Sequence, residues 1–377
     1  MDALTTPSNW QRVRLGDICE IVKGQQINKI SLNNTDKYPV INGGIDFLGY
    51  TNKFNVSKNT IAISEGGTCG YVRFMKSDFW SGGHNYSLQK ISNKVNNLCL
   101  YHILKSYEKD IMKLGVGSGL KNIQLKALKD FEIPLPPLNE QIAIANILSA
   151  LDRYLYALRA LILKKESVKK ALSFELLSQR KRLKGFNQNW QRVRLGDIGK
   201  PCMCKRVMKH QTTRYGEIPF YKIGTFGNTA DAFISKKLFL EYKTKYSFPK
   251  KGDILISASG TIGRAVIYDG KPAYFQDSNI VWIDNDETLV KNDFLFYAYS
   301  NIKWNTEHTT ILRLYNDNFR NTLIPLPPLN EQIAIANILS NVDSEIISLK
   351  NKKRQFENIK KALNHDLMSA KIRVLKK

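Results

Sequence analysis

Two long stretches of this sequence occur twice, and this duplication limits the fold more than any other feature. The string NWQRVRLGDI fills positions 9–18 and again 189–198, and IPLPPLNEQIAIANILS fills 133–149 and again 324–340. Self-similarity at a fixed distance indicates one structural unit that is present twice. The chain therefore predicts two similar halves related by an internal pseudo-two-fold axis.

The segments between the repeats diverge, but they keep common landmarks. Gly67-Thr68-Cys69-Gly70 in the first half corresponds to Gly260-Thr261-Ile262-Gly263 in the second. β-branched runs at 60–64 and 253–257 precede these Gly-Thr turns, and the runs YVRF and AVIY follow them. Short β-branched runs on either side of a glycine turn are typical of hairpins. Each half therefore predicts a globular body of mixed α and β structure.

A long charged segment follows each copy of PLPPLNEQ. Asn139 and Asn330 are expected as helix N-caps, with Glu140 and Glu331 in the first turn. Apolar residues then recur at alternating spacings of three and four, which predicts a coiled-coil seam on each helix. The predicted seam contains Ile144, Ile147, Leu151, Tyr154, Leu158, Leu161, Lys165, Val168 and Leu172 in the first helix, and Ile335, Ile338, Val342, Glu345, Leu349, Lys352, Phe356, Ile359 and Leu363 in the second.

The two helices are expected to pair with each other in antiparallel fashion, because the chain returns through a globular body between them. About 40 helical residues span roughly 60 Å, so the pair would form a spacer of fixed length that holds the bodies at its opposite ends. Leu148, Leu155 and Ile162 add a second apolar flank, which is expected to stay exposed in a two-helix pair. A helical partner protein would cover that flank. Packing of each helix against its own body is the simpler alternative.

The predicted fold is therefore of the α+β class. It has two globular bodies of mixed α/β structure separated by two long antiparallel coiled-coil helices, with an internal pseudo-two-fold repeat. The expected bodies are residues 1–138 and 185–329, and the expected helices are 139–184 and 330–377.

The charge of the chain indicates a polyanionic partner. Fifty-seven Lys and Arg face 33 Asp and Glu, which gives a formal net charge of +24. The basic residues spread over the whole length, so nucleic acid is expected rather than a membrane surface. No run of eighteen apolar residues is present, and five scattered cysteines suit reduced thiols. These features predict a cytoplasmic protein that does not span a membrane.

Polar and basic residues near the Gly-Thr turns are of the types that contact bases and phosphates. Turn geometry and solvation explain any one of them equally well, so the prediction concerns clusters. The candidates are Lys23, Gln25, Lys29, Ser64, Thr68, Arg73, His84, Asn85 and Lys121 in the first body, and Lys205, Arg206, Lys222, Ser257, Ser259, Thr261, Arg264, Gln276, Ser278, Asn279 and Arg313 in the second.

The sequence offers little catalytic chemistry. It lacks a G-x-G-x-x-G loop, a phosphate-binding loop and the Asn-Pro-Pro-aromatic or Asp-Pro-Pro-aromatic motif of amino methyltransferases. Asp231 with Glu241 and Lys243 is a weak nuclease pattern. Cys202 and Cys204, with His210 nearby, form only half of a zinc site. No catalytic residue, metal or cofactor is therefore expected in this chain.

The repeated WQRVRLGDI and PLPPLNEQIAIANIL strings, together with KGDILISASGTIG and YFQDSNIVWI, resemble the specificity subunit of type I restriction-modification enzymes. The first body, with YPVINGG, TIAISEGGTCGYV and FWSGGHNYSLQ, resembles a different subtype of recognition domain. The resemblance covers almost the whole chain.

This resemblance implies that each body is a target-recognition domain that reads one half of a split, asymmetric site in double-stranded DNA. The helices would set the gap between the halves and dock two methyltransferase subunits, and motor-nuclease subunits would complete the complex. S-adenosylmethionine, ATP and magnesium would then belong to the partner chains, which would methylate adenine N6.

Two alternatives remain open at this stage. A coiled-coil scaffold that binds DNA without sequence preference would be displaced equally by any competitor DNA. A stand-alone nuclease or methyltransferase, using residues such as Asp231, would modify DNA unaided.

Overall fold

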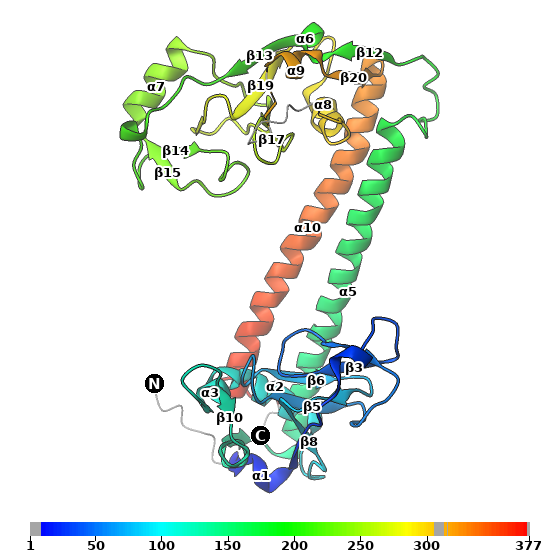
Figure 1. The fold of residues 1–377 in the computed structure, drawn as a ribbon, viewed down its shortest axis with the longest axis vertical. Coiled ribbons are helices and arrows are strands. Elements are labelled where there is room, and N and C mark those ends of the chain that lie inside the picture. The colour runs from blue at the N-terminus through cyan, green and yellow to red at the C-terminus, as the bar shows by residue number, and fades with distance from the viewer. Residues whose placement is uncertain (1–8, 305–312, 315, 375–377) are drawn as a thin grey trace. The chain divides into compact units, whose positions relative to one another are not determined.

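The structure is a computed structural model that describes residues 9–304, 313–314 and 316–374. It divides into two compact units. Unit 1 comprises residues 1–160 and 350–377, and unit 2 comprises residues 161–349. Each unit contains one mixed α/β body and a part of each of two long helices (Figure 1).

The body of unit 1 is built on a four-stranded antiparallel sheet in the order β2-β8-β5-β6. A three-stranded sheet, β4-β3-β7, contains the parallel pair β3 and β7, and β1 pairs with β11. Its elements are β1 (Gln11–Arg14), α1 (Leu15–Ile18), β2 (Glu20–Lys23), η1 (Lys29–Ser31), β3 (Tyr38–Ile41), β4 (Gly49–Thr51), β5 (Thr60–Ser64), β6 (Val72–Met75), β7 (Trp80–Ser81), β8 (Asn85–Gln89), α2 (Asn97–Ser106), α3 (Glu108–Lys113), β9 (Gly115–Val116), β10 (Asn122–Ile123), α4 (Leu125–Lys129) and β11 (Glu132–Leu135).

The body of unit 2 repeats this plan. Its four-stranded sheet has the order β13-β19-β16-β17, its three-stranded sheet has the order β15-β14-β18, and β12 pairs with β20. Its elements are β12 (Gln191–Arg194), α6 (Leu195–Ile198), β13 (Gly199–Met203), η2 (Lys209–Gln211), β14 (Ile218–Tyr221), β15 (Ala232–Ile234), α7 (Lys236–Lys245), β16 (Ile254–Ser257), β17 (Ala265–Ile267), β18 (Tyr274–Phe275), β19 (Ile280–Asn285), α8 (Asn292–Tyr299), α9 (Asn316–Asn321) and β20 (Leu323–Leu326).

Both predicted hairpins are present. β5 pairs in antiparallel fashion with β6, and β16 with β17, on either side of the Gly-Thr turn. Every residue of β16 is buried, as are Ile61 to Ser64 of β5. These strands run through the middle of their sheets, which explains why they are apolar on both faces. The turn that each hairpin carries is therefore held by a rigid support.

The two long helices are α5 (Leu138–Leu177) and α10 (Leu329–Met368), each of 40 residues, as the repeat of apolar residues predicted. In unit 1 Asp152 pairs with Lys360 and Tyr154 packs on Phe356. Residues later in α5 contact residues earlier in α10, so the two helices are antiparallel (Figure 1). No helix in the described residues is long and apolar enough to cross a membrane.

The predicted N-caps, Asn139 and Asn330, are wrong, because each lies one residue inside its helix. The carbonyl oxygen of Pro137 accepts a hydrogen bond from Gln141 N at 2.9 Å, and that of Pro328 accepts one from Gln332 N at 3.0 Å. Proline fixes φ near the helical value. The proline pair therefore starts each helix.

Six of the eighteen predicted seam positions are exposed, so the predicted phase is wrong at those positions. Ile147, Leu161, Val168 and Ile359, assigned to the seam, are 36%, 40%, 46% and 50% exposed. Leu148, Leu155 and Ile162, expected on an exposed flank, are buried, as are Leu339 and Ile346 on α10. The positions that are buried or half-buried at spacings of four and then three include, from the predicted set, Ile144, Leu151, Leu158, Lys165, Leu172, Ile335, Val342, Leu349, Phe356 and Leu363. Tyr154 is also half-buried and packs on Phe356. Ile338 is half-buried and packs against the core of unit 2.

In each unit a buried glutamate at the start of one long helix binds a tryptophan of the body and an arginine that follows the other long helix. In unit 1 the Glu140 carboxylate accepts hydrogen bonds from the Trp10 indole at 3.2 Å and from Arg373 at 2.8 and 3.1 Å. In unit 2 Glu331 accepts from the Trp190 indole at 2.9 Å and from Arg182 at 2.9 Å twice. We call each set a Trp-Glu-Arg cluster. The arginine follows one long helix and binds the start of the other.

The neighbouring glutamine joins the body to the helix. Gln141 accepts a hydrogen bond from Asn96 N at 2.7 Å and donates to Pro136 O at 2.7 Å. Gln332 makes the same contacts in unit 2 with Lys291 N and Pro327 O, both at 2.8 Å. These contacts give a structural reason for the verbatim repeat of PLPPLNEQ.

Candidate nucleic-acid interface

The Gly-Thr turn has the same geometry in both units. Gly70 N donates to Ser64 O at 2.8 Å in unit 1, and Gly263 N donates to Ser257 O at 2.9 Å in unit 2. Gly70 and Gly263 have φ values of +84° and +82°, a region that favours glycine. The repeated glycines therefore set one turn shape on which different side chains are displayed.

In unit 1 a carboxylate gathers the polar groups beside this turn. Glu65, 9% exposed, pairs with Lys23 Nζ at 2.6 Å and lies 3.9 Å from His84 Nδ1. The Tyr86 hydroxyl also donates to Glu65, at 3.3 Å, and burial raises the pKa of Tyr86 to about 12. Lys23 and His84 keep about half of their side chains exposed. Sequence reasoning missed Glu65, although an acid in a basic, glycine-rich turn was a signal.

Three of the candidates in unit 1 are directed into the protein. The Ser64 hydroxyl lies 3.4 Å from Asn85 Oδ1, and both side chains are buried. Arg73 donates to Gly44 O at 3.4 Å and to Ile45 O, and its guanidinium lies over the Phe47 ring at 5.0 Å. Arg73 therefore holds the loop that follows β3 against the hairpin, and Ser64 and Asn85 join β5 to β8.

Most candidates around the turn of unit 2 are also internally bonded. The Ser259 hydroxyl donates to Asn279 Oδ1 at 2.7 Å, and Gln276 Oε1 accepts from Ile223 N at 2.9 Å. Ser257 Oγ donates to Thr261 O and accepts from Arg264 N. Their side chains shape the turn and the loop beside it.

Arg264 takes the role in unit 2 that Arg73 has in unit 1. Its Nη1 donates to Phe226 O at 2.9 Å, in the loop that follows β14. A cavity of about 260 Å³ lies between this loop and the turn. Its lining includes Ile223, Gly224, Phe226, Ser257, Gly260, Thr261 and Arg264. Both arginines therefore position a loop beside the turn.

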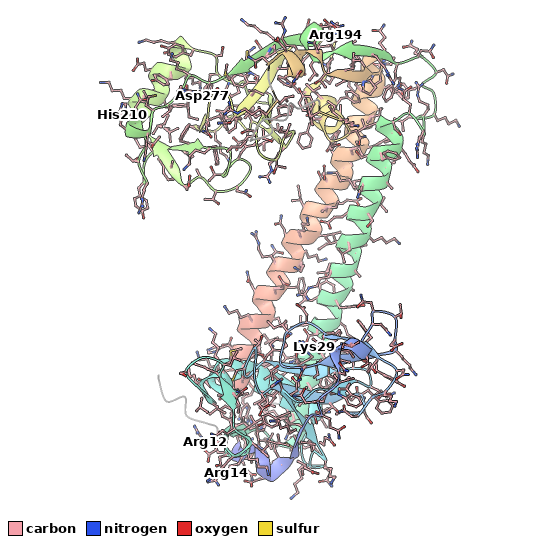
Figure 2. The ribbon with its side chains drawn as sticks, in the orientation of Figure 1. Arg12, Arg14, Lys29, Arg194, His210 and Asp277 are labelled. Carbon is pink, nitrogen blue, oxygen red and sulfur yellow. The ribbon has the colours of Figure 1, made fainter. Side chains whose placement is uncertain are left out.

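The remaining candidates present polar or charged groups at the surface of their own unit. Arg206 pairs with Asp277 at 2.8 Å and Lys222 with Asp231 at 2.8 Å. Lys29 in η1 corresponds to Lys209 in η2, and the next residue there, His210, is also exposed (Figure 2). The exposed or half-exposed members of this remaining group are Lys23, Gln25, Lys29, Thr68, His84 and Lys121 in unit 1, and Lys205, Arg206, Lys222, Thr261, Ser278 and Arg313 in unit 2. Among the internally bonded candidates, Arg264 is also exposed, and Arg73, Gln276 and Asn279 are half-exposed.

Neither suspected metal pattern forms a ligand cluster. Within residues 9–304, 313–314 and 316–374, no three His, Cys, Asp or Glu side chains lie where they could hold a metal ion together. Cys202 and Cys204 are free thiols, and burial raises the pKa of Cys204 to about 12. Asp231 is engaged by Lys222 at the surface.

The comparisons with known proteins account for both halves of the chain. The type I restriction modification DNA specificity domain matches residues 7–166 and again residues 187–358. A protein of Haemophilus influenzae, named as a type I restriction enzyme specificity subunit, is 41% identical over 324 residues. That alignment covers 81% of this chain and 81% of the relative. The chain belongs to the type I restriction-modification specificity subunit family.

More distant relatives of this specificity subunit share its full length. The MjaVIII specificity subunit of Methanocaldococcus jannaschii is 27% identical, over 99% of this chain and 95% of that protein. The crystal structure of an S subunit from M. genitalium has a TM-score of 0.71 at 24% identity and covers 97% of each chain. That likeness supports the fold of two mixed bodies joined by two long helices.

Membership of this family establishes the general function of the chain. It is the DNA specificity subunit of a type I restriction-modification system, and it is a non-catalytic member of that complex. The individual base and phosphate contacts of the candidate residues stay predictions.

Proposed function

We propose that each body reads one half of a bipartite DNA site and that the two halves differ in sequence. The observation that carries this proposal is that the Gly-Thr turn has one backbone geometry and two sets of side chains. Unit 1 places Glu65 with Lys23 and His84 there, and unit 2 places Ser259 with Asn279. Different donors and acceptors select different base edges in the major groove.

The exposed cations of each body would bind the phosphate backbone and position the turn. Lys29 and Lys121 in unit 1 and Lys205 and Arg206 in unit 2 are exposed. Phosphate contacts of this kind give affinity without sequence preference, whereas base contacts give specificity. We assign Arg73, Arg264 and Gln276 to support of the reading loops, since their polar groups bond to backbone atoms.

The two long helices would fix the gap between the half-sites and dock two methyltransferase subunits. Ile142 and Ile147 of unit 1, and Leu161 and Val168 of unit 2, expose apolar surface on α5. Exposed apolar residues on a helix are typical of a helical partner. S-adenosylmethionine, ATP and Mg²⁺ would belong to the methyltransferase and motor-nuclease subunits of the complex, which acts on DNA in the cytoplasm.

The direct test is methylome sequencing of cells that express this chain with its methyltransferase subunit. We expect a split, asymmetric adenine-methylation motif that disappears when the chain is deleted. Methylation without sequence preference would support a DNA-binding scaffold instead. Methylation by the purified chain alone would show that it carries its own active site.

A second experiment tests the helices as a spacer. Seven residues added to α5 and seven to α10, at the same level of the pair, keep the seam phase and lengthen the pair by about 10 Å. We expect the gap between the half-sites to increase while the half-site sequences stay the same. An unchanged gap in an assembled complex would contradict the spacer role.

A further inference from the structure

A short hairpin in unit 1 is fixed against the Gly-Thr turn by its base. β9 pairs with β10, and Ile123 N donates to Glu65 O at 2.9 Å. A Cβ atom at Gly66 would lie 2.3 Å from Asn122 Oδ1, and one at Gly115 would lie 2.6 Å from Cys69 Sγ. The two glycines therefore let the hairpin pack closely against the turn. The base of the hairpin lies beside the residues proposed to read DNA.

The tip of the same hairpin projects into solvent. Residues 117–121 join the two strands, and all five are exposed. Leu120 is 81% exposed and Val116 is 55% exposed, although both are apolar. Around a Cβ atom placed at Gly119 there is open space. The tip is narrow and rich in glycine, and it ends in an exposed leucine. It is therefore small enough to enter a groove of DNA.

We propose that Leu120 is a wedge that inserts between two adjacent base pairs next to the half-site read by unit 1 and kinks the DNA there. Leucine is among the apolar side chains that enter a duplex between base steps, and such insertion partly unstacks the step. This inference rests on the proposed function, because it requires that the body of unit 1 binds DNA.

The charge around the tip favours DNA over a protein partner. Lys121, Lys126 and Lys129 are exposed near the tip, whereas Lys113 pairs with Asp110 at 2.6 Å. Lys121 follows the wedge directly and is exposed. A cationic neighbour beside an apolar tip can bind the phosphate that flanks an opened base step. The base of the hairpin also contacts Glu65, whose carboxylate lies beside Lys23 and His84.

The test uses the complex of the full chain with its methyltransferase subunits. The wild-type complex selects a duplex from a randomised library, and that duplex is labelled at both ends to measure bending by energy transfer. We expect Leu120→Ala to lose most of the bend and to bind about tenfold more weakly, while Leu120→Phe retains both. Leu289→Ala, a matched change at a 50% exposed leucine of unit 2, is expected to leave the bend intact.

A mismatch placed at each step of the duplex in turn gives the decisive control. A mismatched step is already partly unstacked, so at one position it should restore tight binding by Leu120→Ala. Wild-type bending by Leu120→Ala, or the absence of rescue at every step, would overturn the wedge alone. Failure of the wild-type complex to select any split sequence would overturn the proposed function and this inference with it.

Discussion

The two units bury the same residues where their helices begin, but they display different residues at their turns. Glu140 and Glu331 are each about 1–2% exposed and each bind one tryptophan and one arginine. The Gly-Thr turns have the same backbone but differ in charge, since Glu65 in unit 1 corresponds to Ala258 in unit 2. A fixed frame therefore allows the reading surface to vary without loss of the fold.

The same contrast appears inside the helix pair. In unit 2 Lys165 pairs with Glu345, whereas the corresponding positions in unit 1 hold Phe356 and Tyr154, whose rings lie 4.6 Å apart. The layer next to it is an ion pair in both units, Lys169 with Asp343 and Lys360 with Asp152. The seam thus tolerates an exchange of an ion pair for an aromatic pair where one side faces water.

The largest effect is expected at the shared frame. Glu331→Ala leaves Arg182 and the Trp190 indole without their buried partner, and loss of one member of a buried ion pair costs about 3–5 kcal/mol. Glu140→Ala is expected to cost the same within about 1 kcal/mol, as measured by urea unfolding. Glu345→Ala, at a 55% exposed carboxylate, should cost less than about 1 kcal/mol. Strongly unequal costs at Glu140 and Glu331 would contradict the equivalence of the two frames.

The phase of the seam gives the next effect. Leu148→Ala removes a side chain that is 0% exposed and is expected to lower the free energy of unfolding by about 3 kcal/mol. Ile147→Ala, one residue earlier and 36% exposed, should cost about 1 kcal/mol or less. Leu339→Ala repeats the first test in unit 2. Equal costs for Leu148→Ala and Ile147→Ala would restore the phase predicted from the sequence.

Acid should weaken unit 1 before unit 2. Burial lowers the pKa of His102 from its ordinary value of 6.5 to about 4, so the unfolded chain binds more protons between these values. The contribution of His102 to the free energy of unfolding is therefore fully present above pH 6.5. It is lost as the pH falls, by about 2 kcal/mol at pH 5. The corresponding residue of unit 2 is Tyr297, which donates to Asp343 and does not charge in this range. Hydrogen exchange at pH 7.5 and pH 5 measures the difference by unit.

The variant His102→Tyr gives unit 1 the residue that unit 2 has. It should remove the additional acid sensitivity of unit 1. Equal loss of protection in both units of the wild-type chain would show that other groups dominate acid unfolding.

The repeat, the two 40-residue helices and the hairpins could be predicted from the sequence, because each leaves a long or regular pattern. The seam phase could not. Spacings of three and four begin at Ile144 in either order, and both Ile147 and Leu148 are apolar. The bodies decide between them, since Ile144 and Leu148 pack into the core of unit 1.

The position of the Gly-Thr turns could be predicted from the sequence, since both lie between the strands of the expected hairpins. That this region binds DNA stays a prediction. Arg73 and Arg264 are of a type that contacts bases and phosphates, but their partners are carbonyl oxygens of loops distant in sequence. Such partners depend on tertiary contacts, which a local motif does not contain.

The central claim is that each body reads one half of the site, and body-specific variants test it most directly. Methylome sequencing would compare Thr68→Val with His84→Ala in unit 1 against Thr261→Val with Ser278→Ala in unit 2, with assembly of each complex verified. We expect each double variant to relax the sequence of one half of the motif, by about tenfold in preference, and to leave the other half unchanged. Relaxation of both halves by either variant would contradict the account.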